Sequence, residues 1–280
     1  MNKNKDRLQI IEKKKEYEKA KRFNDNVENE PPTIPLNPED VDYLKIKKLN
    51  KVKTKIANKI AFSYIKKLVK KKKLIIKDVN GFENLLNINT GYILTCNHFN
   101  PNDNFALHYV LDKYLKKEKR KFYKVIREGN YSFPGLFGYF FRNCNTLPLS
   151  SNFKTMEKFT NAISTILKRK DIILIYPEQS MWWNYPKPRP LKAGAFRFAV
   201  KNDVPVVPCF ITFNDSNVLD SDGFYVKEYT IHFSKPIYPS KKALTKDEIN
   251  NMAINNFQVW KSIYEEEYKT PLKYEEEDKL

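Results

Sequence analysis

Short apolar runs and stretches of helical period alternate along most of this chain. From about residue 74, runs typical of strands, such as "GYILTCN", "DIILIYP" and "VPVVPCFITF", are separated by stretches with apolar residues every three or four positions. We expect helices over 102–118, 153–169, 192–202 and 245–268. Strands that alternate with helices form a mostly parallel sheet with helices on both faces. The sequence therefore predicts an α/β fold whose mostly parallel sheet is flanked by helices.

The residues before this α/β region follow a different pattern. Residues 1–23 predict a charged helix, and "NDNVENEPPTIPLNPED" predicts a proline-broken linker. A second stretch has apolar residues at helical spacing: Leu49, Val52, Ile56, Ile60, Tyr64 and Leu68. We therefore predict three units: residues 1–39 as a charged helix and Pro-rich linker, 40–73 as a basic amphipathic helical segment, and 74–280 as the main domain.

The charge of the chain points to an anionic partner. The formal net charge is +18, and the stretch from Tyr43 to Lys77 holds 14 lysines and no acidic residue. An apolar stripe flanked by lysines fits a helix that lies on an anionic membrane surface. The same pattern also fits a helix that packs on the domain and turns a charged face to solvent. No motif of nucleic-acid binding is present, so we expect no nucleic-acid partner.

Composition limits the other classes of function. Apolar residues make up 41% of the chain and aromatic residues 14%, which indicates a folded core. The three cysteines, Cys96, Cys144 and Cys209, lack metal-binding spacing, so we expect reduced, structural thiols and no metal. The polar N-terminus resembles neither a signal peptide nor an anchor, and no apolar run is long enough to span a bilayer. We expect a peripheral protein on the cytoplasmic face of a membrane.

The stretch "TCNHFNPNDNF" contains one of only three histidines and offers a candidate acid/base pair. His98 follows an apolar strand, and Asp103 falls in the first turn of the helix predicted to begin near Asn102. The spacing His-x4-Asp lets the carboxylate hold one imidazole nitrogen while the other faces a substrate. No serine or cysteine stands out as a nucleophile, so the activated hydroxyl would belong to the substrate. A purely structural histidine fits this spacing as well.

Four segments in register resemble the glycerophospholipid acyltransferases, the family that includes lysophosphatidic acid acyltransferase. They are "NHFNPND", "IREGNYSFPGLFG", "YPEQS" and "VPVVPC", and the resemblance covers roughly residues 90–237. It implies that 74–280 is an acyltransferase domain that moves a fatty acyl group from a thioester to a glycerolipid hydroxyl. The implied donor is acyl-CoA or acyl carrier protein thioester, and the chemistry requires no bound cofactor and no metal.

The resemblance also implies roles for particular residues. His98 would be the general base and Asp103 its orienting partner, while Glu178, Asn97, Lys192 and Arg189 would bind the substrate. The implied acceptor is a lysolipid, with 1-acyl-sn-glycerol-3-phosphate as the first expectation.

Two departures from the family pattern concern the acceptor. "NTLPLSSNFK" and "YPEQS" lack the family's phosphate-contacting arginines, and four basic residues that follow would have to replace them: Lys187, Arg189, Lys192 and Arg197. A solvated basic loop explains these four equally well. Another lysolipid or a glycolipid is therefore the alternative acceptor, and a non-catalytic membrane-binding protein is the alternative of a different class.

Two aromatic stretches have no settled place in this interpretation. "YSFPGLFGYFF", over 131–141, predicts an irregular loop near the rim of the sheet that enters lipid, or else a buried core loop. Trp182 and Trp183 predict either a contact with lipid or acyl chain, or core packing. We expect His108 and His232 to be structural. Deletion of residues 1–73 is expected to lower vesicle binding more than it alters the fold.

Overall fold

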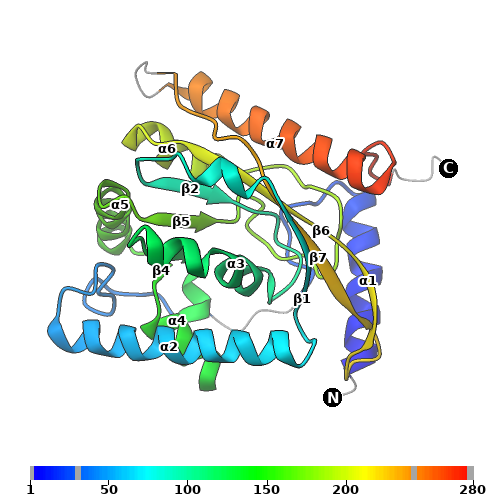
Figure 1. Ribbon diagram of the computed structural model, residues 1–280, viewed down its shortest axis with the longest axis horizontal. Helices are drawn as coiled ribbons and strands as arrows, with labels where there is room; N and C mark the ends of the chain where they lie inside the picture. Colours follow the sequence, from blue (N-terminus) through cyan, green and yellow to red (C-terminus); the bar gives the residue numbers. More distant parts are fainter. Residues whose placement is uncertain (1–2, 29–32, 241–244, 276–280) are drawn as a thin grey trace.

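A computed structural model describes residues 3–28, 33–240 and 245–275 of the chain. Residues 29–32 of the predicted linker and 1–2 of the predicted first helix lie outside the described residues. Within the described part, seven strands form one sheet with the order β1-β7-β6-β2-β5-β3-β4. The β6 and β7 strands are antiparallel, and all other neighbours are parallel. The predicted α/β fold with a mostly parallel sheet is confirmed (Figure 1).

The elements follow one another largely as the pattern predicts. The strands are β1 (Ile75–Asn80), β2 (Tyr92–Thr95), β3 (Phe122–Ile126), β4 (Thr146–Pro148), β5 (Ile172–Ile175), β6 (Val206–Leu219) and β7 (Tyr225–Phe233). The helices are α1 (Lys3–Lys19), α2 (Lys48–Lys70), α3 (Asp103–Lys117), α4 (Gly135–Asn143), α5 (Phe153–Lys168), α6 (Gly194–Asn202) and α7 (Lys246–Tyr268), with 3₁₀ turns η1 (Phe82–Leu85) and η2 (Glu128–Ser132).

Alternate residues of the central strands enter two different cores, one on each face of the sheet. Tyr92 and Leu94 of β2 join the core under α2 and α3, whereas Ile93 between them joins the core under α5, α6 and α7. Successive side chains of a strand point to opposite faces, so a strand covered on both faces is apolar throughout. This explains the unbroken apolar runs in β2 and β5, where every residue is buried.

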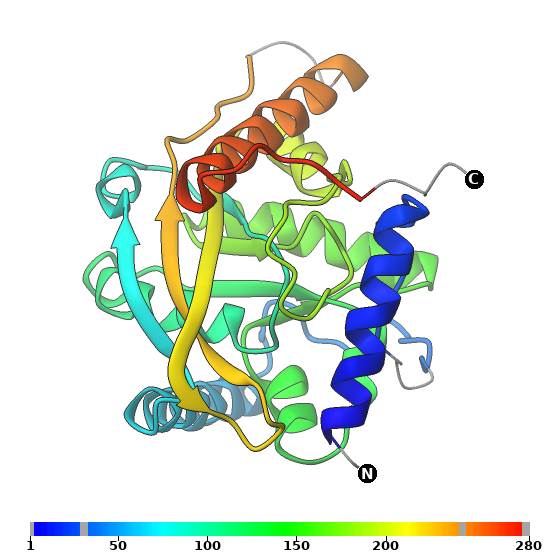
Figure 2. The same ribbon diagram turned by 90° about the vertical axis from the view of Figure 1, so that its right-hand side faces the viewer.

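The β6 strand is longer than the pattern "VPVVPCFITF" predicts, and its second half changes the shape of the molecule. Only Val206–Pro208 pairs with β2, while the residues from Cys209 to Leu219 pair with β7. The β6–β7 hairpin therefore continues beyond the carboxyl edge of the parallel sheet (Figure 2). It forms a wall beside the loop that follows β2.

The segment before α2 packs against the α/β domain. Tyr17, Phe23 and Val27 form a buried cluster with Trp182 and Tyr185, and α1 lies alongside the loop that follows β5 (Figure 2). Leu36, Val41 and Tyr43 belong to the core under α5 and α6. Removing residues 1–73 would uncover both cores. The expectation that this deletion lowers vesicle binding more than it alters the fold stays a prediction, and this packing predicts a large effect on the fold as well.

The α2 helix has apolar side chains on two opposite faces. Its inner face buries Thr54, Ala57, Ala61, Ile65 and Leu68 against the domain. Its outer face leaves large apolar side chains exposed: Leu49, Val52, Ile56 and Ile60. Exposed lysines flank this outer stripe. Of the residues we expected in a single stripe, Leu68 is buried and Tyr64 packs on the domain, whereas packing does not account for the four exposed ones.

The aromatic segment is a helix and not an irregular loop. Pro134 and Gly135 start α4, with Pro134 as its N-cap and Gly135 at a φ of +62°, a backbone conformation that glycine adopts without strain. The ring of Phe137 lies 6.0 Å from that of Tyr64, so α4 packs against α2. Phe140 is buried, while Leu136 and Phe137 are exposed. We took the Pro-Gly pair as a sign of irregular structure, but here it marks the start of a helix.

Candidate active site

The catalytic loop, residues Asn97–Asp103, lies between the end of β2 and the first turn of α3. Ligands of open α/β sheets bind beyond the carboxyl ends of the strands, which is where this loop lies. Asn97 is buried and fixes the start of the loop, because its amide donates to the carbonyl of Ile211 (3.0 Å) and accepts from the Ile211 N–H (2.8 Å). Asn97 therefore positions the turn from within the protein and does not present its amide at the surface.

His98 and Asp103 form the predicted pair. The Nδ1 of His98 lies 2.8 Å from Oδ2 of Asp103, and because an ionised carboxylate can only accept, Nδ1 carries the hydrogen. The side chain of Asp103 is fully buried, whereas that of His98 is 22% exposed. In the neutral imidazole this arrangement puts the free lone pair on Nε2, which could then accept a proton from a substrate hydroxyl.

Three further donors hold the Asp103 carboxylate. The backbone N–H groups of Phe99 and Asn100 point at Oδ2 (3.3 and 3.4 Å), and the hydroxyl of Tyr176 donates to Oδ1 (2.6 Å). Burial and the charge of Asp103 raise the pKa of Tyr176 well above its usual range, so this hydroxyl keeps its hydrogen. The carboxylate is thus fixed in the orientation in which it meets the imidazole.

Tyr176 also fixes the plane of the imidazole. The rings of His98 and Tyr176 stack with centroids 4.0 Å apart and an interplanar angle of 17°. The sequence reasoning missed this residue, although Tyr176 begins the very motif "YPEQS" that carried the resemblance. Since β5 is the neighbour of β2, the residue that follows β5 is brought next to the residues that follow β2. The predicted adjacency of the strands "GYILTCN" and "DIILIYP" would have pointed to Tyr176.

Glu178 and Arg189 lie in the interior and not on a surface open to substrate. Glu178 is 3% exposed and Arg189 is 1% exposed, and they form an ion pair of 3.0 Å. Glu178 also accepts from the backbone N–H groups of His98 (3.0 Å) and Arg189 (2.7 Å). Glu178 thereby joins the catalytic loop to the 176–192 loop. In this structure both side chains contact protein groups, and their contact with the acceptor stays a prediction.

Both terminal nitrogens of the Arg189 guanidinium donate to protein groups. It donates to the Ser180 hydroxyl (2.8 Å), to the Phe23 carbonyl (3.1 Å) and to the Ser180 carbonyl, and it lies over the ring of Trp182. A phosphate could reach it only by displacing these partners. Arg189 therefore cannot replace the family's missing phosphate-contacting arginines in this conformation.

The other basic residues of this region do not converge on one point. Lys187 pairs with Glu18 (2.5 Å), and Arg197 is exposed on α6. Lys192 is half-buried, and its backbone N–H donates to the Pro177 carbonyl (2.8 Å). Among the residues that we expected at the substrate, Lys192 thus keeps its side chain nearest to solvent. The expected cluster of four bases is absent from the described residues.

The segment "YPEQS" keeps a tight turn in the structure. Gln179 has a φ of +66°, the left-handed conformation that glycine adopts most easily, so a glutamine here retains the turn at a cost in strain. Trp182 and Trp183 are both buried, so core packing accounts for both and lipid contact for neither. The backbone N–H of Trp182 donates to the His98 carbonyl (3.1 Å), which ties this stretch to the catalytic loop.

The other two histidines, His108 and His232, lie outside this loop. The pKa of His108 is lowered well below its usual range by burial and by the nearby Lys124, and His232 contacts the Thr212 hydroxyl (3.0 Å). The structure describes no group of three or more His, Cys, Asp or Glu that could hold a metal ion. Within the same residues, no helix combines the length and the apolar character needed to cross a membrane.

Comparison with known proteins supports the resemblance read from the motifs. Residues 77–212 match the family model described as Acyltransferase. A similar solved structure is the crystal structure of the 1-acyl-sn-glycerophosphate (LPA) acyltransferase PlsC from Thermotoga maritima. The match has a TM-score of 0.53 and 17% sequence identity, and it covers 82% of this chain and 87% of that chain. At this identity the likeness establishes the fold alone. A search of curated proteins gave no match.

Proposed function

Because residues 77–212 belong to the acyltransferase family, we propose that this protein transfers a fatty acyl group from an acyl thioester to a hydroxyl of a lysolipid. The observation that carries the proposal is the oriented pair of His98 and Asp103 at the carboxyl edge of the sheet. Acyl-CoA and acyl carrier protein thioester are the two candidate donors.

The geometry supports a direct transfer. Nε2 of His98 removes the proton from the acceptor hydroxyl as its oxygen attacks the thioester carbonyl. Asp103 stabilises the imidazolium that forms, and Tyr176 keeps Asp103 in place. When the tetrahedral intermediate collapses, the carbon–sulfur bond breaks and the imidazolium returns its proton to the departing thiolate. The base is regenerated, and an ester and a free thiol leave.

Two acceptors are supported by different observations. The likeness to the Thermotoga maritima enzyme supports 1-acyl-sn-glycerol-3-phosphate. The missing arginines, together with the buried position of Arg189, support a lysolipid without a phosphate monoester. A panel of acceptors decides between them.

The transfer is tested by incubating the full chain with long-chain acyl thioesters and a panel of lysolipids, and by identifying products by mass spectrometry. We expect a diacyl product from the wild type, and a loss of about 100- to 10,000-fold in rate for His98→Ala. His232→Gln, which alters a histidine away from the catalytic loop, is the matched control and should retain activity. A His98→Ala variant as active as the wild type would overturn the mechanism.

We further propose that the outer stripe of α2, defined by Leu49, Val52, Ile56 and Ile60, docks the protein on an anionic membrane. These side chains are 43% to 64% exposed and are flanked by lysines, the arrangement of a helix at a lipid interface. Each lysine near an anionic surface contributes about 1 kcal/mol of attraction, which salt weakens. This would place the acyltransferase as a peripheral protein on the cytoplasmic face.

Docking is tested with vesicles of phosphatidylglycerol and phosphatidylcholine. Replacing Val52 and Ile56 by Ser should lower the partition into these vesicles by about tenfold or more, since each buried apolar side chain contributes about 1.5 kcal/mol or more. Ile254→Ser on α7 is the matched control, because Ile254 is exposed to a similar degree (56%, against 50% for Ile56). Equal binding by all three proteins would refute docking through α2.

A further inference from the structure

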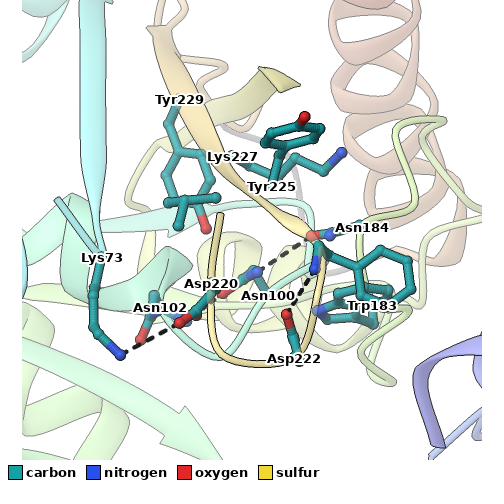
Figure 3. A pocket seen from close by; sticks show the side chains of 12 residues that line it. Lys73, Asn100, Asn102, Trp183, Asn184, Asp220, Asp222, Tyr225, Lys227 and Tyr229 are labelled. Atoms are coloured by element: carbon teal, nitrogen blue, oxygen red, sulfur yellow. Dashed lines mark hydrogen bonds and ion pairs between the residues drawn. The ribbon is translucent and has the colours of Figure 1, made fainter. Parts of the chain in front are cut away.

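A pocket opens between the catalytic loop and the β6–β7 hairpin (Figure 3). It opens to solvent and has a cavity volume of about 50 Å³, which is room for one end of a small polar group. Asn100 and Asn102 come from the loop after β2, Trp183 and Asn184 from the loop after β5, and residues 220–229 from the hairpin. Lys73, at the end of the α2 segment, completes the lining.

The pocket is contiguous with the catalytic pair. Asn100 contributes its side chain to the lining and its backbone N–H to Oδ2 of Asp103 (3.4 Å). Asn184 donates its backbone N–H to the Phe99 carbonyl (2.8 Å) and accepts from the Asn100 amide (3.2 Å). Asp103 also lies close enough for its charge to add to the effect of burial in raising the pKa of Tyr229, another lining residue. A head group held here would lie beside the loop that carries His98.

The charges of this pocket are already balanced by protein partners. Lys73 pairs with Asp220 (3.3 Å), Asp222 with Arg7 (3.5 Å), and Lys227 with Asp215 (2.5 Å). A phosphate monoester would have to break one of these ion pairs to find a cation. Although the chain as a whole is strongly basic, this site offers no free positive charge among its described residues.

The ring of Trp183 in this pocket is not open to a quaternary ammonium group. Such a group needs open aromatic faces and unpaired carboxylates. The ring of Trp183 is covered by the guanidinium of Arg7, 4.4 Å from its centroid, and the ring of Phe224 packs against the same tryptophan at 5.0 Å. Besides the rings of Tyr225 and Tyr229, the lining offers a ligand the amides of three asparagines and the carboxylates of two aspartates.

We propose that this pocket binds an uncharged, hydroxyl-rich head group, a sugar or a cyclic polyol, on the acceptor lysolipid. The inference rests on the proposed acyl transfer to a lysolipid. Hydroxyl groups both donate and accept, so they match the amides of Asn100, Asn102 and Asn184 and the carboxylate oxygens of Asp220 and Asp222 without disturbing any ion pair. The absence of the phosphate-contacting arginines would then favour an uncharged head group over a phosphate.

The test compares acceptors that share one acyl chain and one donor. Monoacyl galactosylglycerol, lysophosphatidate, lysophosphatidylcholine and monoacylglycerol are offered to the full chain, and kcat/KM is measured by mass spectrometry. We expect the galactosyl acceptor to exceed each of the other three by about tenfold or more, as two or more hydrogen bonds would give. Equal or better use of any of those three overturns the inference and leaves the acyl transfer standing. No product with any acceptor defeats the proposed function itself.

Two variants place the preference in this pocket. Asp220→Asn keeps an acceptor for the Ser221 N–H and releases Lys73 from its ion pair. We expect the KM for the galactosyl acceptor to rise about threefold to tenfold and the KM for lysophosphatidate to fall, with kcat unchanged for the former. Asn184→Gly suits the φ of +49° at this position and removes the amide, so it should raise only the KM for the galactosyl acceptor.

The matched control is Asp112→Asn, which also removes one half of an aspartate–lysine pair (2.7 Å to Lys116) but lies outside the pocket on α3. It should leave the ratio between the two acceptors as in the wild type. An unchanged ratio in both Asp220→Asn and Asn184→Gly would show that the head group binds elsewhere and would overturn the assignment.

Discussion

The buried ion pair of Glu178 and Arg189 gives the sharpest test of how this active site is held together. We predict that Arg189→Met destabilises the protein strongly and lowers activity through misplacement of the catalytic loop. In the wild type, Glu178 accepts from the His98 N–H, so a disturbed Glu178 acts directly on the residue that carries the base. A role of Arg189 in holding acceptor phosphate predicts a raised KM and normal stability instead.

The magnitude follows from the burial of both partners. Removing one member of a buried ion pair leaves an uncompensated charge and costs about 3–5 kcal/mol. Arg189 also donates to the Phe23 carbonyl (3.1 Å) and the Ser180 hydroxyl (2.8 Å), which lose their partner in the variant. For a chain of this length, 1 kcal/mol shifts Tm by about 2–4 °C, so we expect Tm to fall by about 10 °C.

The assay is a double-mutant cycle followed by tryptophan fluorescence during denaturation. The variants are Arg189→Met, Glu178→Gln and the combination of both. Because the double variant buries no charge, we expect it to be more stable than Arg189→Met alone, with a coupling free energy of about 2 kcal/mol or more. Trp182 lies beneath the guanidinium, and its emission reports directly on this site.

Lys192→Met is the matched control, because it removes a half-buried basic side chain a few residues away that takes no part in the described hydrogen bonds of Glu178 and Arg189. Its free energy of unfolding should change by less than about 0.5 kcal/mol. The reasoning is refuted if Arg189→Met keeps the stability of the wild type and shows only a higher KM for the acceptor.

Three further predictions concern the catalytic pair and a buried lysine. Asp103→Asn should lower kcat by about 100-fold or more with KM little changed, measured by product formation, since His98 loses its orienting carboxylate. Tyr176→Phe should lower kcat about tenfold, because one donor to Asp103 is lost, and unchanged kinetics would remove Tyr176 from the mechanism. Burial lowers the pKa of Lys124 to about 8 in the folded protein, against 10.5 in the unfolded chain. Between these two pH values the lysine is protonated only in the unfolded state, so the free energy of unfolding rises with pH. Lys124→Met should be more stable than the wild type at pH 7, and its advantage in Tm should shrink over that pH range.

Most of the parallel sheet could be predicted because each strand is covered on both faces. "GYILTCN" and "DIILIYP" each contain an unbroken apolar run, Tyr92–Leu94 and Ile172–Ile175, so the strands stand out without any alternation. The long β6 could not be predicted in full, because beyond Phe213 its exposed and half-buried residues resemble a loop. Its pairing with β7 is set by tertiary contacts that a local pattern does not contain.

The catalytic pair was accessible to sequence reasoning, whereas its supports were not. His98 and Asp103 are five residues apart in the chain and meet through one local turn. Tyr176 and Glu178 come from the loop after the neighbouring strand, and the order of strands in the sheet has to be known before they can be placed. Motif resemblance located Glu178. Its burial and its contacts with the His98 N–H and the Arg189 guanidinium became apparent only in the structure.

The N-terminal segment combines packing on the domain with the proposed docking surface, and a pattern of charges cannot distinguish the two. The α1 region lies against the loop after β5, where Lys14 donates to the Trp183 carbonyl (2.5 Å) and the Asp25 carbonyl accepts from Trp182 Nε1 (2.9 Å). It also reaches the head-group pocket through Arg7. The outer stripe of α2 touches none of this and faces solvent. Truncation would therefore disturb the active site and the proposed docking surface together, and only side-chain replacements on the outer face of α2 separate membrane binding from catalysis.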